Sequence, residues 1–196
     1  GTLSRLGPDG TTGVAVLERC SRPIPGADAT PGPLPTPGQT PTEATGGVLP
    51  AAPPCKGPQL TLAAGDGDAG AGNRVTNFSL QNLGTQACSL TGYPTVTLQD
   101  ARGRTLSSIR AEQSPGSYFR QGQAPKPVEL APRAKAYFEM AWSVVPNEAM
   151  QKTCPDAATI KVTAPSDTAA VSLPFSFSPC GGRIRVSPIR AEANPA

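Results

Sequence analysis

Apolar and polar residues alternate in short stretches from residue 59 onward. In the clearest stretch, 134–144, every second position is apolar: Ala134, Ala136, Phe138, Met140, Trp142 and Val144. Because successive side chains of a strand point to opposite faces, this alternation predicts a strand with one buried face. The same pattern predicts strands at 59–63, 74–83, 95–99, 159–163, 171–177 and 183–186. Pro174 predicts an edge position or a bulge, since proline has no N–H to donate to a neighbouring strand.

Turn-forming residues separate these strands, at Gly65-Asp66-Gly67, at 100–103, at Pro115-Gly116 and at Gly181-Gly182. No window of eleven or more residues has the apolar period of a helix. Seven to nine short strands joined by turns predict an all-β fold, a two-layer antiparallel β-sandwich.

Proline marks a change of character before the predicted sandwich. Eleven of the 24 prolines fall between Pro23 and Pro58, in a stretch with few large apolar residues. Such a stretch cannot bury enough surface to offset its ordering entropy, and repeated proline favours the extended polyproline II conformation. We therefore predict a Pro-rich linker at 23–54, a sandwich domain at 55–190 and a tail at 191–196. The linker could also be a ligand for an aromatic groove, although a plain tether is the preferred interpretation.

Residues 1–22 form a separate N-terminal segment. Positions 12–17 have the alternation of one strand, which would either stay disordered or join a sheet elsewhere, because a lone strand is unstable in water. The 196 residues contain no apolar run of signal-peptide or membrane-spanning length. We therefore expect contact with a membrane only through an anchor outside this chain.

Histidine is absent from the whole sequence. This excludes Ser-His-Asp and Cys-His nucleophile systems, histidine zinc sites and the usual near-neutral proton shuttle. The net charge is +3, and the basic residues of the predicted domain are spread at loop-like spacing. A nucleic-acid-binding face would concentrate them, so we expect no nucleic-acid partner.

Five cysteines occur, at positions 20, 55, 88, 154 and 180. None forms a CxxC pair, and without histidine a zinc site would need four thiolates at spacings that resemble no zinc ribbon. Disulfides are the favoured interpretation, because Cys55, Cys88, Cys154 and Cys180 lie near predicted strand ends and the composition is typical of an exported chain. We expect an extracytoplasmic location: periplasmic, cell-surface or secreted.

A series of short motifs resembles one protein family. The motifs are Cys55, Leu60, Ala71-Gly72-Asn73, Phe78-Ser79-Leu80-Gln81-Asn82, Ala87-Cys88-Ser89-Leu90, Gly92-Tyr93-Pro94, Cys154 and Cys180-Gly181-Gly182. Together they resemble the Domain of Unknown Function 4232 family, exported bacterial domains that often follow a membrane anchor or lipidated cysteine and a Pro-rich linker. The resemblance covers residues 55–188. It implies an immunoglobulin-like sandwich with disulfides Cys55 to Cys88 and Cys154 to Cys180, and no catalytic motif.

Cys20 has no partner in this scheme. Glu18 and Arg19 precede it, where a lipidation signal needs a small residue after an apolar run, so we expect no lipidation there. An intermolecular disulfide and a free thiol both remain open.

One local cluster could hold a metal ion. Asp66, Asp68 and Asn73 offer oxygen ligands within a short stretch, which is the chemistry that calcium prefers. The stretch lacks the glutamate of an EF-hand loop and suits a glycine-rich strand connection better. We therefore expect no metal and no other cofactor.

The polar stretch 113–127 contains candidate binding residues. Tyr118 and Phe119 lie beside Arg120, and Lys126 follows. Aromatic residues beside arginine are favoured at protein interfaces, so this loop is the candidate contact surface. A loop that folds its aromatic pair back onto the sandwich is an equally good interpretation.

These observations predict a non-enzymatic binding or scaffolding module, secreted or in the cell envelope, whose partner is an unknown protein or envelope component. The alternative is a carboxylate-dependent hydrolase or transferase that acts on envelope polysaccharide. Its carboxylates would come from Glu129, Glu139, Glu148 or Asp156, whose spacing selects no pair.

Overall fold

The computed structural model describes residues 51–117, 119, 121–147, 149 and 153–193. The N-terminal segment, Cys20 and most of the predicted linker lie outside the described residues. Within the described part, one short 3₁₀ helix, η1 (Gly57–Gln59), precedes ten strands. The strands are β1 (Leu60–Gly70), β2 (Asn73–Asn82), β3 (Cys88–Leu90), β4 (Thr95–Gln99), β5 (Arg110–Gln113), β6 (Val128–Leu130), β7 (Lys135–Ser143), β8 (Ala157–Thr163), β9 (Ala170–Phe177) and β10 (Cys180–Val186).

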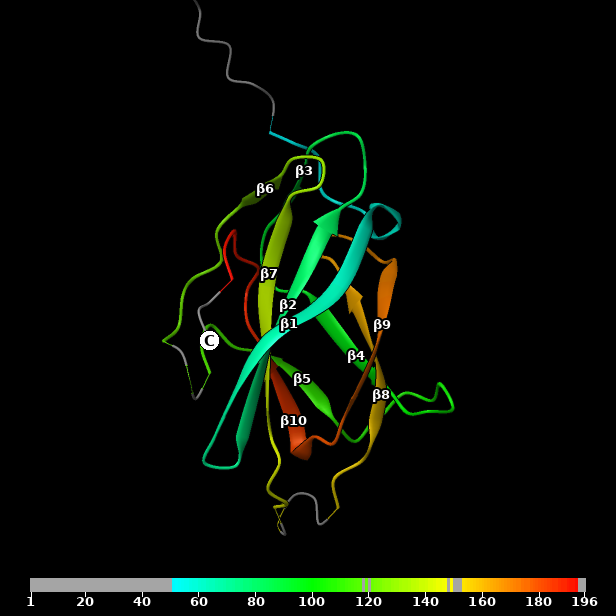
Figure 1. Cartoon of the computed structure of the whole chain (residues 1–196), viewed down its shortest axis with the longest axis vertical. Coiled ribbons are helices and arrows are strands. Elements are labelled where there is room, and N and C mark those ends of the chain that lie inside the picture. The colour runs from blue at the N-terminus through cyan, green and yellow to red at the C-terminus, as the bar shows by residue number, and fades with distance from the viewer. Residues whose placement is uncertain (1–50, 118, 120, 148, 150–152, 194–196) are drawn as a thin grey trace, which may run out of the picture. The chain divides into compact units, whose positions relative to one another are not determined.

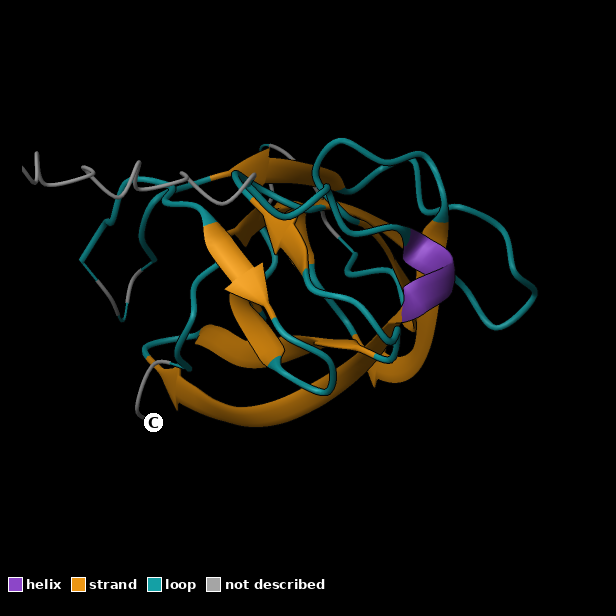
Figure 2. Ribbon diagram, turned by 90° about the horizontal axis from the view of Figure 1, so that it is seen from above, coloured by secondary structure: helices purple, strands orange, loops and turns teal. Residues whose placement is uncertain are grey.

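The strands form a β-sandwich (Figures 1 and 2). One layer is a five-stranded sheet in the order β1-β2-β7-β10-β5, and the other is a three-stranded sheet in the order β4-β8-β9. A small sheet of β3 and β6 lies at the upper end of Figure 1. The strand pairs are antiparallel, as predicted, except that β5 runs parallel to β10. The all-β prediction is therefore confirmed, with one parallel pair at a sheet edge.

Aromatic side chains fill the core between the two main sheets. Phe78 of β2 stacks on Phe138 of β7, with ring centroids 5.4 Å apart. Phe175 of β9 meets Phe78 edge-on at 5.3 Å. Trp142 of β7 packs on Phe177 of β9 at 4.7 Å. The apolar face predicted at 134–144 is thus the face that β7 turns toward the opposite sheet.

The structure corrects the turn predicted at Gly65-Asp66-Gly67. β1 continues through these residues, and its pairing with β2 shifts register between Ala64 and Gly67. The chain instead reverses at Ala71 and Gly72, which have φ values of 45° and 77°. Positive φ at both central positions is the geometry of a type I′ hairpin turn, whose twist matches that of the flanking strands. Gly65 and Gly67 therefore accommodate a bulge within β1 rather than a turn.

Two further features of the strands bear on the sequence predictions. β9 is the edge of its sheet, and Pro174 pairs with Thr159 next to a register shift, so the edge or bulge predicted from this proline is confirmed. The short strands β3, β5 and β6 were not predicted. All four residues of β5 are exposed, so the alternation that marks a strand with one buried face is missing there.

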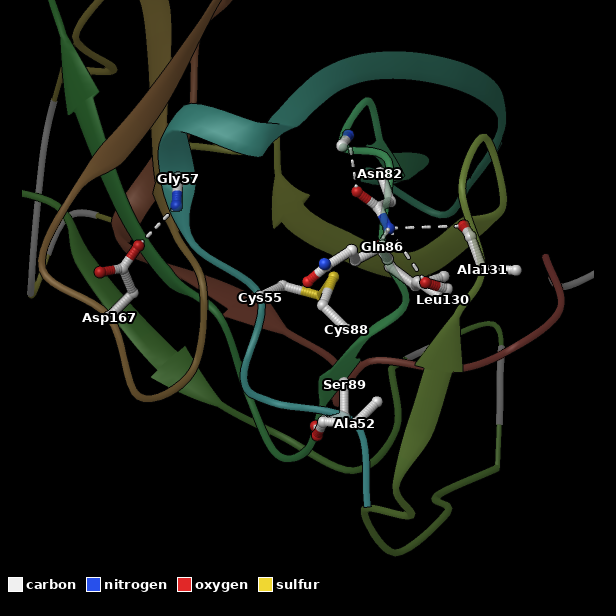
Figure 3. Close-up of a disulfide and its surroundings, with 11 residues drawn as sticks. Ala52, Cys55, Gly57, Asn82, Gln86, Cys88, Ser89, Leu130, Ala131 and Asp167 are labelled. Atoms are coloured by element: carbon white, nitrogen blue, oxygen red, sulfur yellow. Dashed lines mark hydrogen bonds between the residues drawn. A yellow bond between two sulfur atoms is a disulfide. The ribbon is translucent and has the colours of Figure 1, made fainter. Parts of the chain in front are cut away.

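The Cys55 to Cys88 disulfide joins the start of the domain to β3 (Figure 3). Both cysteines are fully buried. The backbone supports the bridge, because the N–H of Cys55 donates to the carbonyl of Ser89 at 2.9 Å. The adjacent Gly57 N–H donates to the carboxylate of Asp167 at 2.6 Å, which ties the same segment to the connection between β8 and β9.

Asn82, at the end of β2, links three parts of the chain beside this disulfide (Figure 3). Its side-chain amide donates to the carbonyls of Gln86 at 2.8 Å and Leu130 at 3.0 Å. Its side-chain oxygen accepts the N–H of Gly84 at 2.8 Å. Asn82 is fully buried, so these bonds satisfy polar atoms that water cannot reach. The residue therefore holds β2, β3 and β6 in their relative positions.

Candidate functional site

The pairing of β10 with β7 is irregular at the start of β10. Cys180 pairs with Ser143 and Ile184 pairs with Trp142, so the register between the two strands shifts across residues 181–183. Gly181 and Gly182 have φ values of 74° and 72°. A left-handed backbone costs other residues about 1–2 kcal/mol each, which explains two consecutive glycines here. The turn predicted at this pair is therefore corrected to a wide bulge inside β10.

A pocket of about 490 Å³ lies at this bulge, and we call it the β10 pocket. Its polar and charged lining residues are Asn73, Ser143, Asn147, Arg183 and Arg185. They come from the start of β2, the end of β7, the segment after β7, and β10. These strand ends meet at the lower end of Figure 1. The volume falls within the range of about 300–1,000 Å³ that small-molecule sites occupy.

The segment after β7 forms one wall of the β10 pocket. The N–H of Val144 donates to the carbonyl of Gly72 at 2.8 Å, and the N–H of Val145 donates to the hydroxyl of Ser143 at 3.1 Å. The first bond holds the wall against the β1–β2 turn, and the second fixes the conformation of the segment itself. A Cβ at Gly72 would collide with the Val145 side chain, so the turn glycine also makes this contact possible. Val145 remains 55% exposed and adds an apolar rim.

Arginines dominate the electrostatics of the β10 pocket. Arg183 and Arg185 are two residues apart on β10, so their side chains lie on one face of the sheet. Arg183 Nη1 lies 3.8 Å from the Glu112 carboxylate, with the two side chains 48% and 46% exposed. Such an exposed ion pair contributes only about 0–1 kcal/mol, because water screens it. Among the described residues that line the pocket, none is acidic.

The second predicted disulfide lies at this site. Cys154 is bonded to Cys180, the pocket residue that immediately precedes the glycine bulge. Cys180 is 2% exposed, and Cys154 is half-buried. The bridge fixes the point at which β10 begins. Both disulfide pairings implied by the family resemblance are therefore found in the structure.

The structure describes only part of the loop that was predicted as a contact surface. Tyr118 and Arg120 lie outside the described residues. Phe119 is half-buried, and its ring lies 3.4 Å from where a Cβ would sit on Gly70. Phe119 therefore packs against the sandwich, and the role of the loop as a contact surface stays a prediction. Lys126 is exposed and lines a second pocket of about 370 Å³, so it does not reach the β10 pocket.

The carboxylates considered for hydrolysis lie in different surroundings. Glu139 is 3% exposed and lies 3.8 Å from Arg190, in a buried ion pair. Glu129 is exposed on β6, and Asp156 accepts a hydrogen bond from the Ser178 hydroxyl at 2.6 Å. Glu148 lies outside the described residues. Of the three described carboxylates, Glu129, Glu139 and Asp156, none lines either pocket.

The three candidate calcium ligands do not form a cluster of acidic ligands. Asp66 and Asp68 are exposed on β1, and the carboxylate of Asp68 accepts the N–H of Ala69. The side-chain amide of Asn73 donates to the carbonyl of Ala71 at 3.2 Å. Over the described part of the chain, no three His, Cys, Asp or Glu residues are grouped to hold a metal ion.

The fold and its two bridges define the class: a disulfide-bonded β-sandwich domain. The family model "Domain of unknown function (DUF4232)" matches residues 55–190, and the chain belongs to this family. No curated protein matches the sequence. No helix in the described residues is long and apolar enough to cross a membrane.

Several of the residues that carry the family resemblance have structural roles here. Asn82 and Cys88 hold the small sheet in place, as described above. Gly92 has a φ of 107°, and its carbonyl accepts the N–H of Ile189 at 2.8 Å. The family motifs therefore account for the scaffold and leave most of the β10 pocket undefined.

Sequence reasoning missed the two pocket arginines. They were part of a predicted strand, and nothing in a single strand indicates which face will border a pocket. One signal was present in retrospect: Gly181-Gly182 is followed by arginines at alternating positions, 183 and 185, which a strand places on one face.

Proposed function

We propose that this domain is a non-enzymatic binding or scaffolding module of the cell envelope or of the secreted fraction, and that it contacts its partner at the β10 pocket. The observation that carries the proposal is the pocket itself, in which two arginines and three polar side chains border one concavity. Binding sites are commonly concave and held by a rigid scaffold with a few polar groups that fix orientation. Two sheet strands and a disulfide supply that rigidity here.

The extracytoplasmic location is part of the proposal. Two disulfides support it, because such bonds form and persist in oxidising compartments and are rare in the cytosol. The absence of histidine from the sequence supports a non-enzymatic role, since the commonest general base is missing.

Site-specific crosslinking tests the binding role directly. The photoreactive residue p-benzoylphenylalanine would be placed in the full chain at position 145, on the rim of the pocket, and separately at position 83. Leu83 is the matched control, because it is an exposed apolar residue that lines neither pocket. After illumination on envelope preparations of the producing cell, we expect a discrete crosslinked product from position 145 only.

The pocket arginines decide whether that product is specific. Changing Arg183 and Arg185 together to Gln should abolish it, whereas Arg102→Gln in the turn after β4 should leave it unchanged. Equal products from positions 145 and 83 would contradict the proposal. Release of reducing ends from isolated envelope polysaccharide by the purified full chain would contradict the non-enzymatic part.

A further inference from the structure

We propose that the β10 pocket binds an anionic group, a carboxylate or a phosphate, that is attached to a small apolar body. The inference rests on the proposed function, because it names the ligand class of the same pocket. It is drawn from the arginine geometry, the local charge and the composition of the rim.

The two pocket arginines are spaced to act on one ligand. Arg183 and Arg185 are alternate residues of β10, so their Cα atoms are about 7 Å apart and their side chains leave the same face. Each guanidinium presents a planar fork of N–H donors that matches the oxygens of a carboxylate or phosphate. On the next strand, β7, the register partner of Arg185 is Ala141, which also lines the pocket, and its small side chain leaves room above the sheet.

Positive charge is concentrated on this face beyond what the fold requires. Arg183 is the register partner of Arg110, and Arg185 is the register partner of Glu112. Like charges on adjacent strands destabilise a sheet, and Glu112 is the one acidic residue on β5 or β10. Within these two strands, three arginines therefore share a single carboxylate. An anion in the pocket would relieve this repulsion.

The remaining lining adds hydrogen-bonding and apolar contacts. Asn147 uses its side-chain oxygen to accept the N–H of Ala149 at 3.0 Å, which leaves its amide group as a donor at the pocket. Val145 and Pro146 are exposed at the rim. Hydrogen-bond donors and exposed apolar groups around one pocket suit a ligand with a charged end and a short apolar portion.

Titration by nuclear magnetic resonance tests the ligand class. The ¹⁵N-labelled full chain would be titrated with inorganic phosphate, with N-acetylalanine and with the neutral N-acetylalanine amide, at constant ionic strength. We expect saturable shifts of the 181–185 amides with phosphate, with N-acetylalanine or with both, and none with the amide. Phosphate alone or the carboxylate alone would support the inference and identify the source of the anion.

Matched variants locate the effect. Arg185→Gln and Arg183→Gln should each weaken anion binding at least about tenfold, because each removes a charge-assisted hydrogen-bond donor. Arg102→Gln is the control, since Arg102 is exposed in the 100–103 turn and does not line the pocket. A dispersed spectrum would show that each variant folds. Equal binding of the neutral amide, unchanged affinity in both pocket variants, or no saturable shift with either anion would overturn the inference.

The two proposals fail in different ways. If crosslinking from position 145 depends on the arginines but neither anion saturates the pocket, the binding role stands and the ligand class is wrong. If the anions bind as expected but position 145 yields no product, the ligand class stands and the binding role in the envelope is wrong.

Discussion

Arg183 of β10 lies directly opposite Arg110 of β5 in the parallel pairing of the two strands. Register partners in a sheet share a face, so these two cations are cross-strand neighbours. Repulsion between the two cations lowers the stability of the sheet. Arg183 also lines the pocket beside the glycine bulge. This combination suggests that binding rather than stability accounts for Arg183.

Replacing Arg183 should separate stability from binding. Arg183→Thr removes the repulsion with Arg110 and places a residue of high β-propensity on the strand. It also removes an exposed ion pair worth about 0–1 kcal/mol. We expect the free energy of unfolding in urea at low ionic strength to stay within about 0.5 kcal/mol of the native value, while phosphate affinity falls at least about tenfold. A loss of stability above about 1 kcal/mol would instead assign Arg183 to the scaffold.

The glycine bulge should be sensitive to a single methyl group. Gly181→Ala and Gly182→Ala each place a side chain at positive φ, so each should lower the free energy of unfolding by about 1–2 kcal/mol and weaken phosphate binding. Gly65→Ala is the control, because a Cβ there would make an ordinary contact of 3.5 Å and its φ is not positive. Urea unfolding would measure the three effects. Equal losses at all three positions would show that the positive φ of the bulge glycines does not matter for stability.

Replacing Asn82 should lower the stability of the domain more than replacing any other buried polar residue. Asn82→Ala removes the side-chain hydrogen bonds to the carbonyls of Gln86 and Leu130 and to the N–H of Gly84, and each polar group left buried and unpaired costs about 1–3 kcal/mol. We expect a loss of about 3 kcal/mol or more in urea unfolding. Gln81→Ala is the matched control, because its amide bonds the exposed carbonyl of Arg133 and its loss should cost less than about 1 kcal/mol. Similar losses for the two variants would contradict the role assigned to Asn82.

The two disulfides should act alike on stability and differently on binding. They close loops with sequence separations of 33 and 26, for which chain entropy gives about 3–4 kcal/mol each. Changing either pair to alanine should therefore lower the free energy of unfolding by similar amounts. Phosphate binding under folding conditions should weaken only when Cys154 and Cys180 are changed, because Cys180 precedes the bulge. Equal effects of both pairs on the affinity would contradict this.

Asp167 should make stability depend on pH in acid. The Gly57 N–H, followed by the Thr168 N–H, lowers the pKa of Asp167 below its ordinary value of 3.8. Since the folded-state pKa is depressed, the contribution is present above pH 3.8 and is lost as pH falls through the folded-state pKa. Asp167→Asn should reduce stability above that pH, and the difference from the native chain should shrink below it. Urea unfolding midpoints of the two chains, measured across this pH range, would show the difference shrinking. A difference in midpoint that stays constant with pH would contradict the prediction.

The sequence predicted the scaffold better than the site, for a physical reason. A strand with one buried face, such as 134–144, alternates in polarity because every second side chain points toward the core. β5 is exposed at all four residues and gains its place through pairing with β10, which no local pattern reveals. Cys180 and Asn73 were both singled out, but as a bridge and as a metal ligand. Their meeting with Arg183 at one pocket depends on register across β2, β7 and β10.

A crystal structure of the full chain grown with phosphate or N-acetylalanine would test the central claim most directly. The account predicts density for the anion between the guanidinium groups of Arg183 and Arg185, in a pocket free of lattice contacts, with the Gly181-Gly182 bulge as described. A pocket empty of the anion at saturating concentration, with anions bound instead at other surface arginines, would contradict it.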